Sequence, residues 1–333
     1  MKMRKLGKNG PEISALGYGA MSFSNFYGAT TDQNSQDILA ACLDAGVSHL
    51  DTANVYGMGR SEDQIGTFLK NNPGARERFH IATKASITKD ADGIRCFRNT
   101  PEHLETELDQ SLARMGIECV DLFYVHRRQS DLPIEEVAGT LKRLMDKGKI
   151  KGIGFSEIAP SSLRRAATEC HVDAVQSEYS LSVRSPELGL VQTCAELGTA
   201  LVAFSPVGRS LLTDAPLTPK AVAEAGGWIA ANPRFTEPNY SANMAALAPF
   251  RAYAADLGVS AAALAIAWVL AQGEHVIAIP GTRSTAHFAQ LVQGWNLDLT
   301  AEQLARITQI LPVGWAHGDR YSDDQWVGPE RYC

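Results

Sequence analysis

Residues 49–57 read HLDTANVYG, a short apolar run that ends in Asp51 and is followed closely by Tyr56. Two later segments repeat this pattern: FHIATK (79–84) ends in Lys84, and VDLFYVH (120–126) ends in His126. A parallel strand that is apolar along its length and polar only at its C-terminal end is typical of a β/α barrel, whose reactive groups lie where the strands end. The three segments therefore predict a barrel with four reactive polar residues at its mouth.

Strand-like runs alternate with amphipathic helical runs along the chain, and no polar linker or shift in composition divides them. Helix starts are marked by Thr100-Pro101-Glu102 and by Ala159-Pro160-Ser161. The strand-like runs number eight, as in the closed β/α barrel, so we expect residues 1–333 to form a single (β/α)8 TIM barrel domain. The predicted strands are SALGYG (14–19), HLDTA (49–53), FHIATKA (79–85), VDLFYVH (120–126), IKGIGFS (150–156), AVQSEYS (174–180), ALVAFSPV (200–207) and HVIAIPG (275–281).

Three segments lie outside this repeat. Residues 3–14 contain two short runs about an Asn9-Gly10 turn, which predicts an N-terminal β-hairpin that caps the closed bottom of the barrel. A long insertion of residues 208–242 follows the seventh strand, and a tail covers residues 311–333. We expect the tail to cover the barrel mouth, with packing on the outer helices as the alternative, because it is rich in ring-bearing side chains. These are Trp315, His317, Tyr321, Trp326 and Tyr332.

Composition and charge disfavour several classes of function. A hydrophobic content of 45% and a charged content of 20% are typical of a soluble globular protein, and a net charge of -6 provides no basic face for nucleic acid or anionic lipid. The basic N-terminus is not followed by a long apolar stretch, so we expect no signal peptide, no membrane span and a cytoplasmic location. The six cysteines have no metal-ligand spacing, which predicts free thiols and no metal site. They are Cys42, Cys96, Cys119, Cys170, Cys194 and Cys333.

Seven motifs occur in the order and spacing of the aldo-keto reductase family, which the chain resembles over essentially its full length. They are LDTANVYG (50–57), FHIATK (79–84), DLFYVHR (121–127), KGIGFSE (151–157), VQSEYSL (175–181), FSPVGRSLL (204–212) and IPGTR (279–283). Residues 133–157, NPRF (232–235) and GDRY (318–321) further resemble a branch with bacterial and plant members that includes perakine-reductase-like enzymes. The resemblance implies that the protein reduces aldehydes or ketones to alcohols with NADPH, with NADH as a possible substitute.

Carbonyl reduction by hydride transfer places negative charge on the carbonyl oxygen, so the site needs a proton donor and hydrogen bonds to that oxygen. Tyr56 is the candidate acid, but an ordinary tyrosine pKa of about 10 makes it slow unless a nearby cation favours the phenolate. Lys84 would supply this cation and Asp51 would be its counter-ion, which leaves His126 to orient the substrate oxygen. The resemblance assigns the same roles to these four residues. Each one taken alone has an ordinary structural explanation.

The cofactor residues rest on the resemblance, because the chain lacks the GxGxxG sequence that opens a dinucleotide-binding βαβ unit. Near the nicotinamide we expect Gly19, Ala20 and Met21, although tight barrel packing is an equal explanation for Gly17-Tyr18-Gly19. Ser156 and Gln176 match the family's carboxamide-binding positions. Phe204 matches the aromatic residue that stacks on the nicotinamide ring.

Two further segments resemble phosphate-binding loops. The loop after the seventh strand resembles the one that covers the pyrophosphate, although Arg209 could instead be a solvated charge. The loop after the eighth strand lies at a helix N-terminus, where Arg283 could hold the 2′-phosphate and so favour NADPH. Leu291 departs from the family pattern because it cannot hydrogen-bond adenine. The predicted residues of the two loops are Ser205, Pro206, Gly208, Arg209, Gly281, Thr282, Arg283, His287 and Gln290.

Two rival classes of function remain open. Schiff-base lyases also use a lysine at a barrel strand end, but they need its neutral amine, which Asp51 would disfavour. A cofactor-binding redox sensor on the same fold, which channel-associated β subunits resemble, would keep all four residues.

The expected partner is a small-molecule carbonyl substrate, aromatic or of medium chain length. Arg128 leaves an anionic substrate open, and the sequence does not indicate the oligomeric state.

Overall fold

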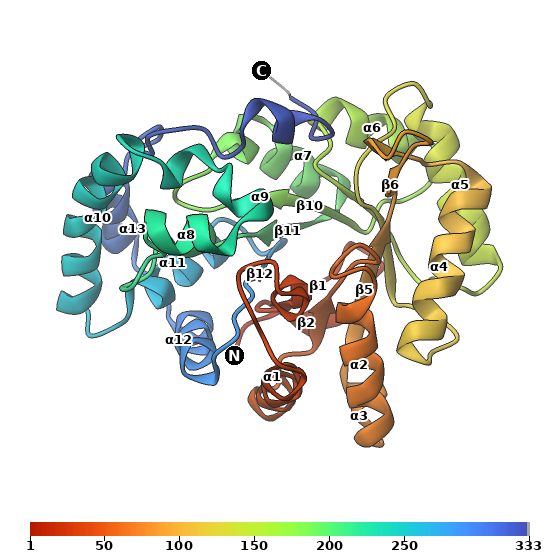
Figure 1. The fold of residues 1–333 in the computed structure, drawn as a ribbon, viewed down its shortest axis with the longest axis horizontal. Coiled ribbons are helices and arrows are strands. Elements are labelled where there is room, and N and C mark those ends of the chain that lie inside the picture. Colours follow the sequence, from red (N-terminus) through yellow and green to blue (C-terminus); the bar gives the residue numbers. More distant parts are fainter. Residues whose placement is uncertain (332–333) are drawn as a thin grey trace.

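Eight parallel strands form the barrel wall in the order β3-β4-β5-β8-β9-β10-β11-β12. Figure 1 labels β5, β10, β11 and β12 among them. The computed structural model describes residues 1–331. The order follows the sequence, as expected when each strand is followed by a helix that returns the chain to the same end, and it confirms the predicted (β/α)8 barrel. The strands are β3 (Tyr18–Gly19), β4 (His49–Asp51), β5 (His80–Ala85), β8 (Leu122–Val125), β9 (Ile153–Ser156), β10 (Ala174–Glu178), β11 (Ala200–Phe204) and β12 (Val276–Ile279).

The barrel closes where β3 meets β12. Gly17 N donates to Ala278 O at 2.8 Å, and Gly19 N donates to Pro280 O at 2.9 Å. A Cβ atom on Gly19 would lie 2.8 Å from Ile279 O, and one on Gly281 would lie 2.4 Å from Gly19 O. Tight packing is therefore a sufficient reason for glycine at these positions.

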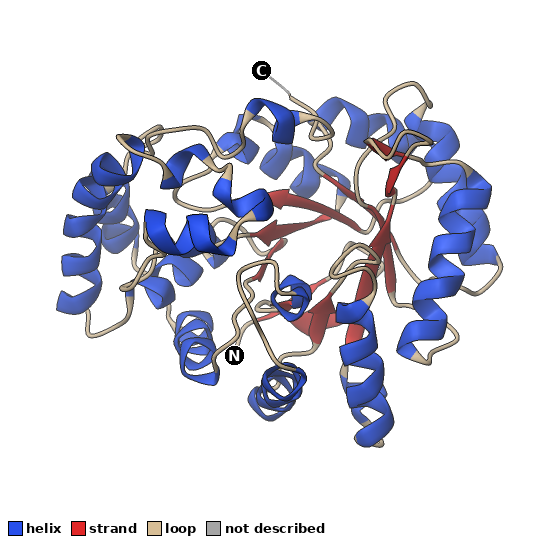
Figure 2. Ribbon diagram, in the orientation of Figure 1, coloured by secondary structure: helices blue, strands red, loops and turns tan. Residues whose placement is uncertain are grey.

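Helices surround the strands on the outside, as Figure 2 shows. Pro101 and Pro160 begin two of them as predicted, and Thr100 caps the first by accepting a hydrogen bond from His103 N. The α-helices are α1 (Asp32–Ala45), α2 (Arg60–Asn71), α3 (Ala75–Arg78), α4 (Pro101–Met115), α5 (Ile134–Asp146), α6 (Pro160–Glu169), α7 (Leu190–Leu197), α8 (Pro219–Ala225), α9 (Gly227–Ala230), α10 (Asn239–Asp256), α11 (Ala261–Leu270), α12 (Thr285–Asn296) and α13 (Ala301–Ile310).

The N-terminal hairpin pairs β1 (Met3–Lys5) with β2 (Glu12–Ser14) and covers the bottom of the barrel. Leu6 packs into the inner core with Leu122 and Val202, and Lys8 N donates to Gly198 O at 2.7 Å just before β11. The turn is wider than the predicted Asn9-Gly10 pair. It spans residues 7–10. The chain already turns at Gly7, which adopts the left-handed conformation with φ of 74° and whose carbonyl oxygen accepts from Gly10 N at 3.3 Å.

A second hairpin follows β5 and was not predicted. It pairs β6 (Ile87–Lys89) with β7 (Arg95–Phe97) and stands at the barrel mouth. Asp90 Oδ1 closes its turn by accepting hydrogen bonds from Asp92 N at 3.0 Å and Ile94 N at 2.9 Å. Asp92-Gly93 is the sequence signal that could have revealed this hairpin.

The insertion and the tail meet above the strand ends. The insertion contains η3 (Gly208–Ser210), α8, α9, η4 (Pro233–Phe235) and the start of α10, and the tail contains η5 (Asp323–Trp326). Trp315 Nε1 donates to Leu181 O at 2.8 Å, and Asn232 Nδ2 donates to Arg320 O at 2.9 Å. These bonds confirm that the tail lies over the mouth. The remaining 3-10 turns of the described chain are η1 (Ala20–Ser24) and η2 (Ser185–Leu188). Tyr332 and Cys333 lie outside the described residues.

Three findings concern the whole described chain. Among residues 1–331, no single helix has the length and apolar character to cross a membrane; only α10 and α11, bent by 89°, would pass together by length and composition. Cys42, Cys96, Cys119, Cys170 and Cys194 are free thiols. Within the described part of the chain, no three His, Cys, Asp or Glu side chains group as metal ligands would.

Candidate active site

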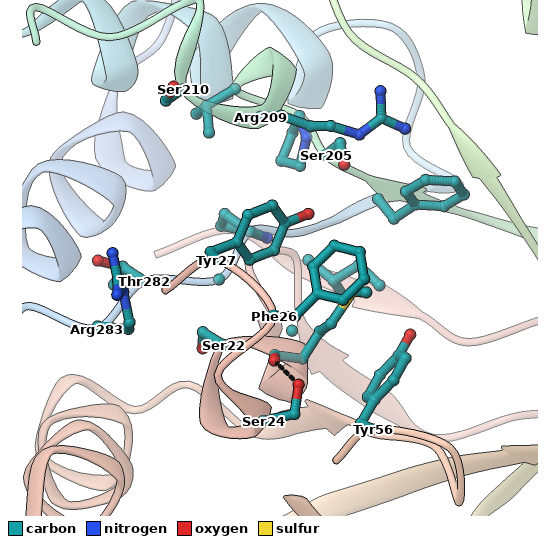
Figure 3. Close-up of a pocket in the computed structure, with 18 of the residues that line it drawn as sticks. Ser22, Ser24, Phe26, Tyr27, Tyr56, Ser205, Arg209, Ser210, Thr282 and Arg283 are labelled. Atoms are coloured by element: carbon teal, nitrogen blue, oxygen red, sulfur yellow. Dashed lines mark hydrogen bonds between the residues drawn. The ribbon is translucent and has the colours of Figure 1, made fainter. Parts of the chain in front are cut away.

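A cavity of about 780 Å³ opens at the carboxyl ends of the barrel strands. Figure 3 shows Tyr56 on one side, Ser205, Arg209 and Ser210 on a second side, and Thr282 with Arg283 on a third. Phe26 and Tyr27 lie between these groups (Figure 3). The cavity therefore joins the predicted catalytic residues to both predicted phosphate-binding loops.

The four predicted catalytic residues meet at one end of this cavity. Lys84 is fully buried, and its Nζ forms an ion pair with Asp51 Oδ1 and donates to Thr52 O at 2.7 Å. Gln176 Nε2 donates to the other carboxylate oxygen, Asp51 Oδ2, at 2.7 Å. Both oxygens of Asp51 are thus bonded, as a buried carboxylate requires.

Tyr56 and His126 both line the cavity in front of this ion pair. Their rings meet nearly edge to face, with centroids 5.8 Å apart and planes inclined by 81°. The Lys84 ammonium lies 5.2 Å from the centroid of the Tyr56 ring. Tyr56 and His126 can therefore reach a substrate together, while Lys84 lies behind them.

Burial and neighbouring charge set the protonation of the two cavity-facing groups. Burial and the negative charge of Asp51 raise the pKa of Tyr56, and Arg127 is the cation that opposes this rise. Burial, together with Arg127 and Lys84, holds the pKa of His126 well below its ordinary value. At neutral pH the phenol keeps its proton and the imidazole is neutral, so both can donate a hydrogen bond to one carbonyl oxygen.

Burial also lowers the pKa of Lys84, and Asp51 opposes that shift. The positive charge of Lys84 is paired with Asp51 and lies beside the Tyr56 ring. The tuning of Tyr56 by Lys84 stays a prediction.

The residues predicted near the nicotinamide lie beside the catalytic end. Gly19, Met21, Ser156, Gln176 and Phe204 line the cavity. Ala20 is buried behind them and its carbonyl oxygen accepts a hydrogen bond from Ser61 Oγ at 2.8 Å, so its side chain supports the wall without bordering the described cavity. A flat ring could lie against the Phe204 face here.

The predicted pyrophosphate loop follows β11. Ser205, Pro206 and Arg209 line the cavity, whereas Gly208 lies behind them. Arg209 is buried, and its Nη2 pairs with Glu178 Oε2 at 2.6 Å while its Nη1 donates to Arg320 O at 3.1 Å. Arg209 is therefore not a solvated charge, and Glu178 already balances the charge expected to attract a pyrophosphate.

The other arm of the cavity precedes α12. Gly281, Thr282, Arg283, His287 and Gln290 line it, and Ser284 caps the helix by accepting a hydrogen bond from His287 N. Arg283 Nη1 donates to Ala29 O at 2.9 Å, which ties this arm to the loop between β3 and α1. The guanidinium and the helix N-terminus together form a positive site that could hold a phosphate.

The cavity residues that the sequence analysis missed include three with polar or apolar side chains from the second hairpin and the tail. Ile87 and Arg95 come from the unpredicted hairpin, and Gln325 comes from η5. Gln325 belongs to a capping box with Ser322, and this Ser-x-x-Gln pattern is a readable signal for a helical turn.

Two neighbouring residues of the loop after β8 behave differently from each other. Arg127 lines the cavity, whereas Arg128 pairs with Glu330 Oε1 at 2.5 Å. The loop is held by Gln129, whose N donates to Asn99 Oδ1 at 2.6 Å and whose Oε1 accepts from Asn99 N at 2.8 Å. This reciprocal pair is the structural role of Gln129.

Comparisons with known proteins agree with this geometry. The model of the Aldo/keto reductase family matches residues 15–312. Aldo-keto reductase yakc [NADP(+)] of Schizosaccharomyces pombe is 33% identical over 322 residues, covering 96% of this chain and 94% of that protein. Probable aldo-keto reductase 1 of Glycine max is 34% identical over 318 residues, covering 95% and 91%. The chain belongs to the aldo/keto reductase family.

Solved structures show the same barrel. Glycerol dehydrogenase AKR11B4 from Gluconobacter oxydans superposes with a TM-score of 0.81 at 26% identity, covering 93% of this chain and 94% of that one. The aldo-keto reductase AKR11C1 from Bacillus halodurans gives a TM-score of 0.75 at 25% identity, covering 98% and 99%.

Proposed function

We propose that this protein is an NADPH-dependent oxidoreductase that reduces aldehydes or ketones to alcohols. The observation that carries the proposal is the joint position of Tyr56 and neutral His126 on the cavity wall, with the buried Lys84 and Asp51 pair behind them. The S. pombe relative, whose name includes NADP(+), supports the choice of cofactor.

The chain's own residues supply the proton and the oxyanion stabilisation. NADPH, when bound, supplies the hydride. The imidazole of His126 donates a hydrogen bond to the carbonyl oxygen, and Tyr56 Oη transfers its proton to that oxygen as negative charge develops. The phenolate that remains is stabilised by the nearby ammonium of Lys84, which Asp51 keeps in place.

The two loops would hold the rest of the cofactor. Phe204 offers a face for the nicotinamide ring, and Ser205 lies where the pyrophosphate would pass. Arg283, at the start of α12, is the proposed partner of the 2′-phosphate and hence the reason for preferring NADPH to NADH. Leu291 gives the adenine an apolar contact only.

A Schiff-base mechanism does not fit the position of Lys84. Its Nζ is buried and bonded to Asp51 and Thr52, and Lys84 is not among the residues that line the described cavity. A substrate carbonyl would have to displace the ion pair to reach it.

Consumption of NADPH with a panel of aromatic, aliphatic and sugar carbonyls tests the proposal. We expect turnover with several carbonyls, weaker turnover with NADH, and a loss of about 100- to 10,000-fold in kcat for Tyr56→Phe, which removes only the acidic hydroxyl. Tyr240→Phe, on α10 outside the cavity lining, is the matched control. Saturable NADPH binding without turnover of any carbonyl would favour the redox-sensor alternative instead.

A further inference from the structure

Arg127 is a buried cation that has no carboxylate partner among the described residues. Its side chain is 9% exposed and lines the cavity at the catalytic end. Its Nη1 donates to His126 O at 2.6 Å and to Ser156 Oγ at 3.1 Å, while its Nε is buried without a hydrogen-bond partner. Among residues 1–331, no Asp or Glu oxygen lies within 4.0 Å of the Arg127 guanidinium nitrogens, so it forms no ion pair there. A buried guanidinium in this state calls for an anion from elsewhere.

The backbone of Arg127 is fixed by groups from two other elements. Its carbonyl oxygen accepts hydrogen bonds from Ser86 Oγ at 2.5 Å and from Asn99 Nδ2 at 3.2 Å. Asn99 is in turn held by the reciprocal bonds with Gln129. The guanidinium therefore points into the cavity from a rigid support, which reduces the entropy lost when it binds a ligand.

Arg95 adds a second cation to the same wall. It stands on β7 and lines the cavity, and its guanidinium carbon lies 5.0 Å from the centroid of the Phe97 ring. Its hydrogen bond to Val327 O is long, at 3.4 Å, and it has no carboxylate partner in the described chain. Burial and the positive charge of Arg127 lower the pKa of Arg95, which shows that the two guanidinium groups are close enough to repel each other.

Three other arginines around the mouth are paired with carboxylates. Arg128 bonds to Glu330, Arg209 to Glu178, and Arg320 to Glu157 and Glu178. The two carboxylates that line the cavity are also engaged: Asp51 by Lys84 and Gln176, and Asp214 by Ala261 N. Among the described residues, three cations that line the cavity form no ion pair: Arg283 in the other arm, and Arg127 and Arg95 at the catalytic end, where both lower the pKa of His126.

We propose that the preferred substrate is a carbonyl compound that also carries a carboxylate, which Arg127 and Arg95 bind while the carbonyl oxygen faces Tyr56 and His126. The planar guanidinium matches a carboxylate with two parallel hydrogen bonds. This inference rests on the reductase function proposed above and adds the substrate class to it. It moves the anion-binding role from Arg128, where the sequence suggested it, to Arg127.

The test compares 4-formylbenzoate with its neutral methyl ester by the ratio of their kcat/KM values. We expect the ratio to favour the carboxylate in the wild type and to fall about 10- to 100-fold in Arg127→Met, the range of one charge-assisted hydrogen-bonded contact. Arg95→Met should lower the ratio by a smaller factor, because Arg95 is more exposed. Arg128→Gln, which removes the same charge one residue away, should leave the ratio unchanged.

The outcomes separate the two proposals. Absence of turnover with both aldehydes and with every other carbonyl would contradict the reductase function itself. Turnover of both aldehydes with a ratio that Arg127→Met does not change would overturn the carboxylate inference alone and leave Arg127 as a positioning residue for His126 and Ser156. If Arg127→Met does not fold, Arg127→Lys replaces it, because lysine keeps the charge but lacks the planar guanidinium. The inference would also be overturned if the kcat/KM ratio of the two aldehydes in both Arg127→Lys and Arg95→Met equalled that of the wild type.

Discussion

Asp51 uses both carboxylate oxygens to hold the catalytic end of the cavity, one on Lys84 and one on Gln176. We expect Asp51→Asn to lower the free energy of unfolding by about 3–5 kcal/mol, because it leaves Lys84 buried without its counter-ion. Adding Lys84→Met should recover part of this loss, since the double variant buries no unpaired charge. Urea unfolding of the two single variants and the double variant measures the coupling. Strictly additive losses would mean that the pair does not act as one unit.

Arg283 is the single residue on which the proposed preference for NADPH depends. In the structure its guanidinium donates to Ala29 O, and a 2′-phosphate would offer it a stronger, charged acceptor. Arg283→Gln should raise the KM for NADPH by about 10- to 100-fold and change the KM for NADH far less. Arg306→Gln is the control, because Arg306 is exposed on α13 and outside the cavity lining. Equal changes for both cofactors would assign the 2′-phosphate to another group.

At the scale of elements, the C-terminal tail is joined to the ends of β9 and β10 through a buried ionic cluster. Arg320 Nη1 donates to Glu157 Oε1 at 3.0 Å and to Glu178 Oε2 at 3.3 Å, and Arg209 joins from the loop after β11. Burial alone would raise the pKa of Glu157, but Arg320 lowers it to about 2. The tail, two strands and the predicted pyrophosphate loop therefore depend on the same charges.

This cluster predicts how stability depends on pH. Because the folded pKa of Glu157 lies below the ordinary value of about 4.3, the group stabilises the fold above that pH and loses this contribution as pH falls toward 2. The contribution is about 3 kcal/mol, so urea unfolding should show a smaller loss between pH 7 and pH 3 in Glu157→Gln than in the wild type. Glu224→Gln, which removes an exposed carboxylate 3.8 Å from Lys220, should follow the wild type. The same pH dependence in all three proteins would exclude Glu157 as the responsible group.

Elements whose signals are local were predictable. The runs around Asp51, Lys84 and His126 became β4, β5 and β8, and Pro101 and Pro160 begin helices where the sequence indicated. The choice between Arg127 and Arg128 was not predictable, because loop residues have no periodicity that says which of two neighbours points inward. Ser86, Asn99 and Glu330 decide it, and they come from distant parts of the chain.

At the scale of the whole molecule, the barrel order and the existence of a cover over its mouth were predictable from the sequence, but the contacts of that cover were not. Eight strands with short helical connections permit few topologies, so their order is nearly fixed once they are recognised. The insertion and tail are instead placed by long-range hydrogen bonds, such as Trp315 to Leu181 and Asn232 to Arg320. The sequence could therefore predict that a cover exists, from its aromatic residues, but not which of its side chains line the cavity.

Barrel closure depends on the close approach of β3 and β12, and Gly281 tests this. A Cβ atom there would lie 2.4 Å from Gly19 O, and backbone cannot move aside as a flexible side chain can. We expect Gly281→Ala to lower the free energy of unfolding by about 1–3 kcal/mol, the usual cost of overpacking. Gly139→Ala is the matched control, because Gly139 lies inside α5 and its Cβ would meet only side-chain ends at 3.6 Å. There alanine should stabilise the fold by about 0.5–1 kcal/mol through its helix propensity. Opposite shifts of the urea midpoint for these two identical substitutions would show that the seam, and not the loss of glycine as such, limits stability; shifts of the same sign and size would contradict this account of closure.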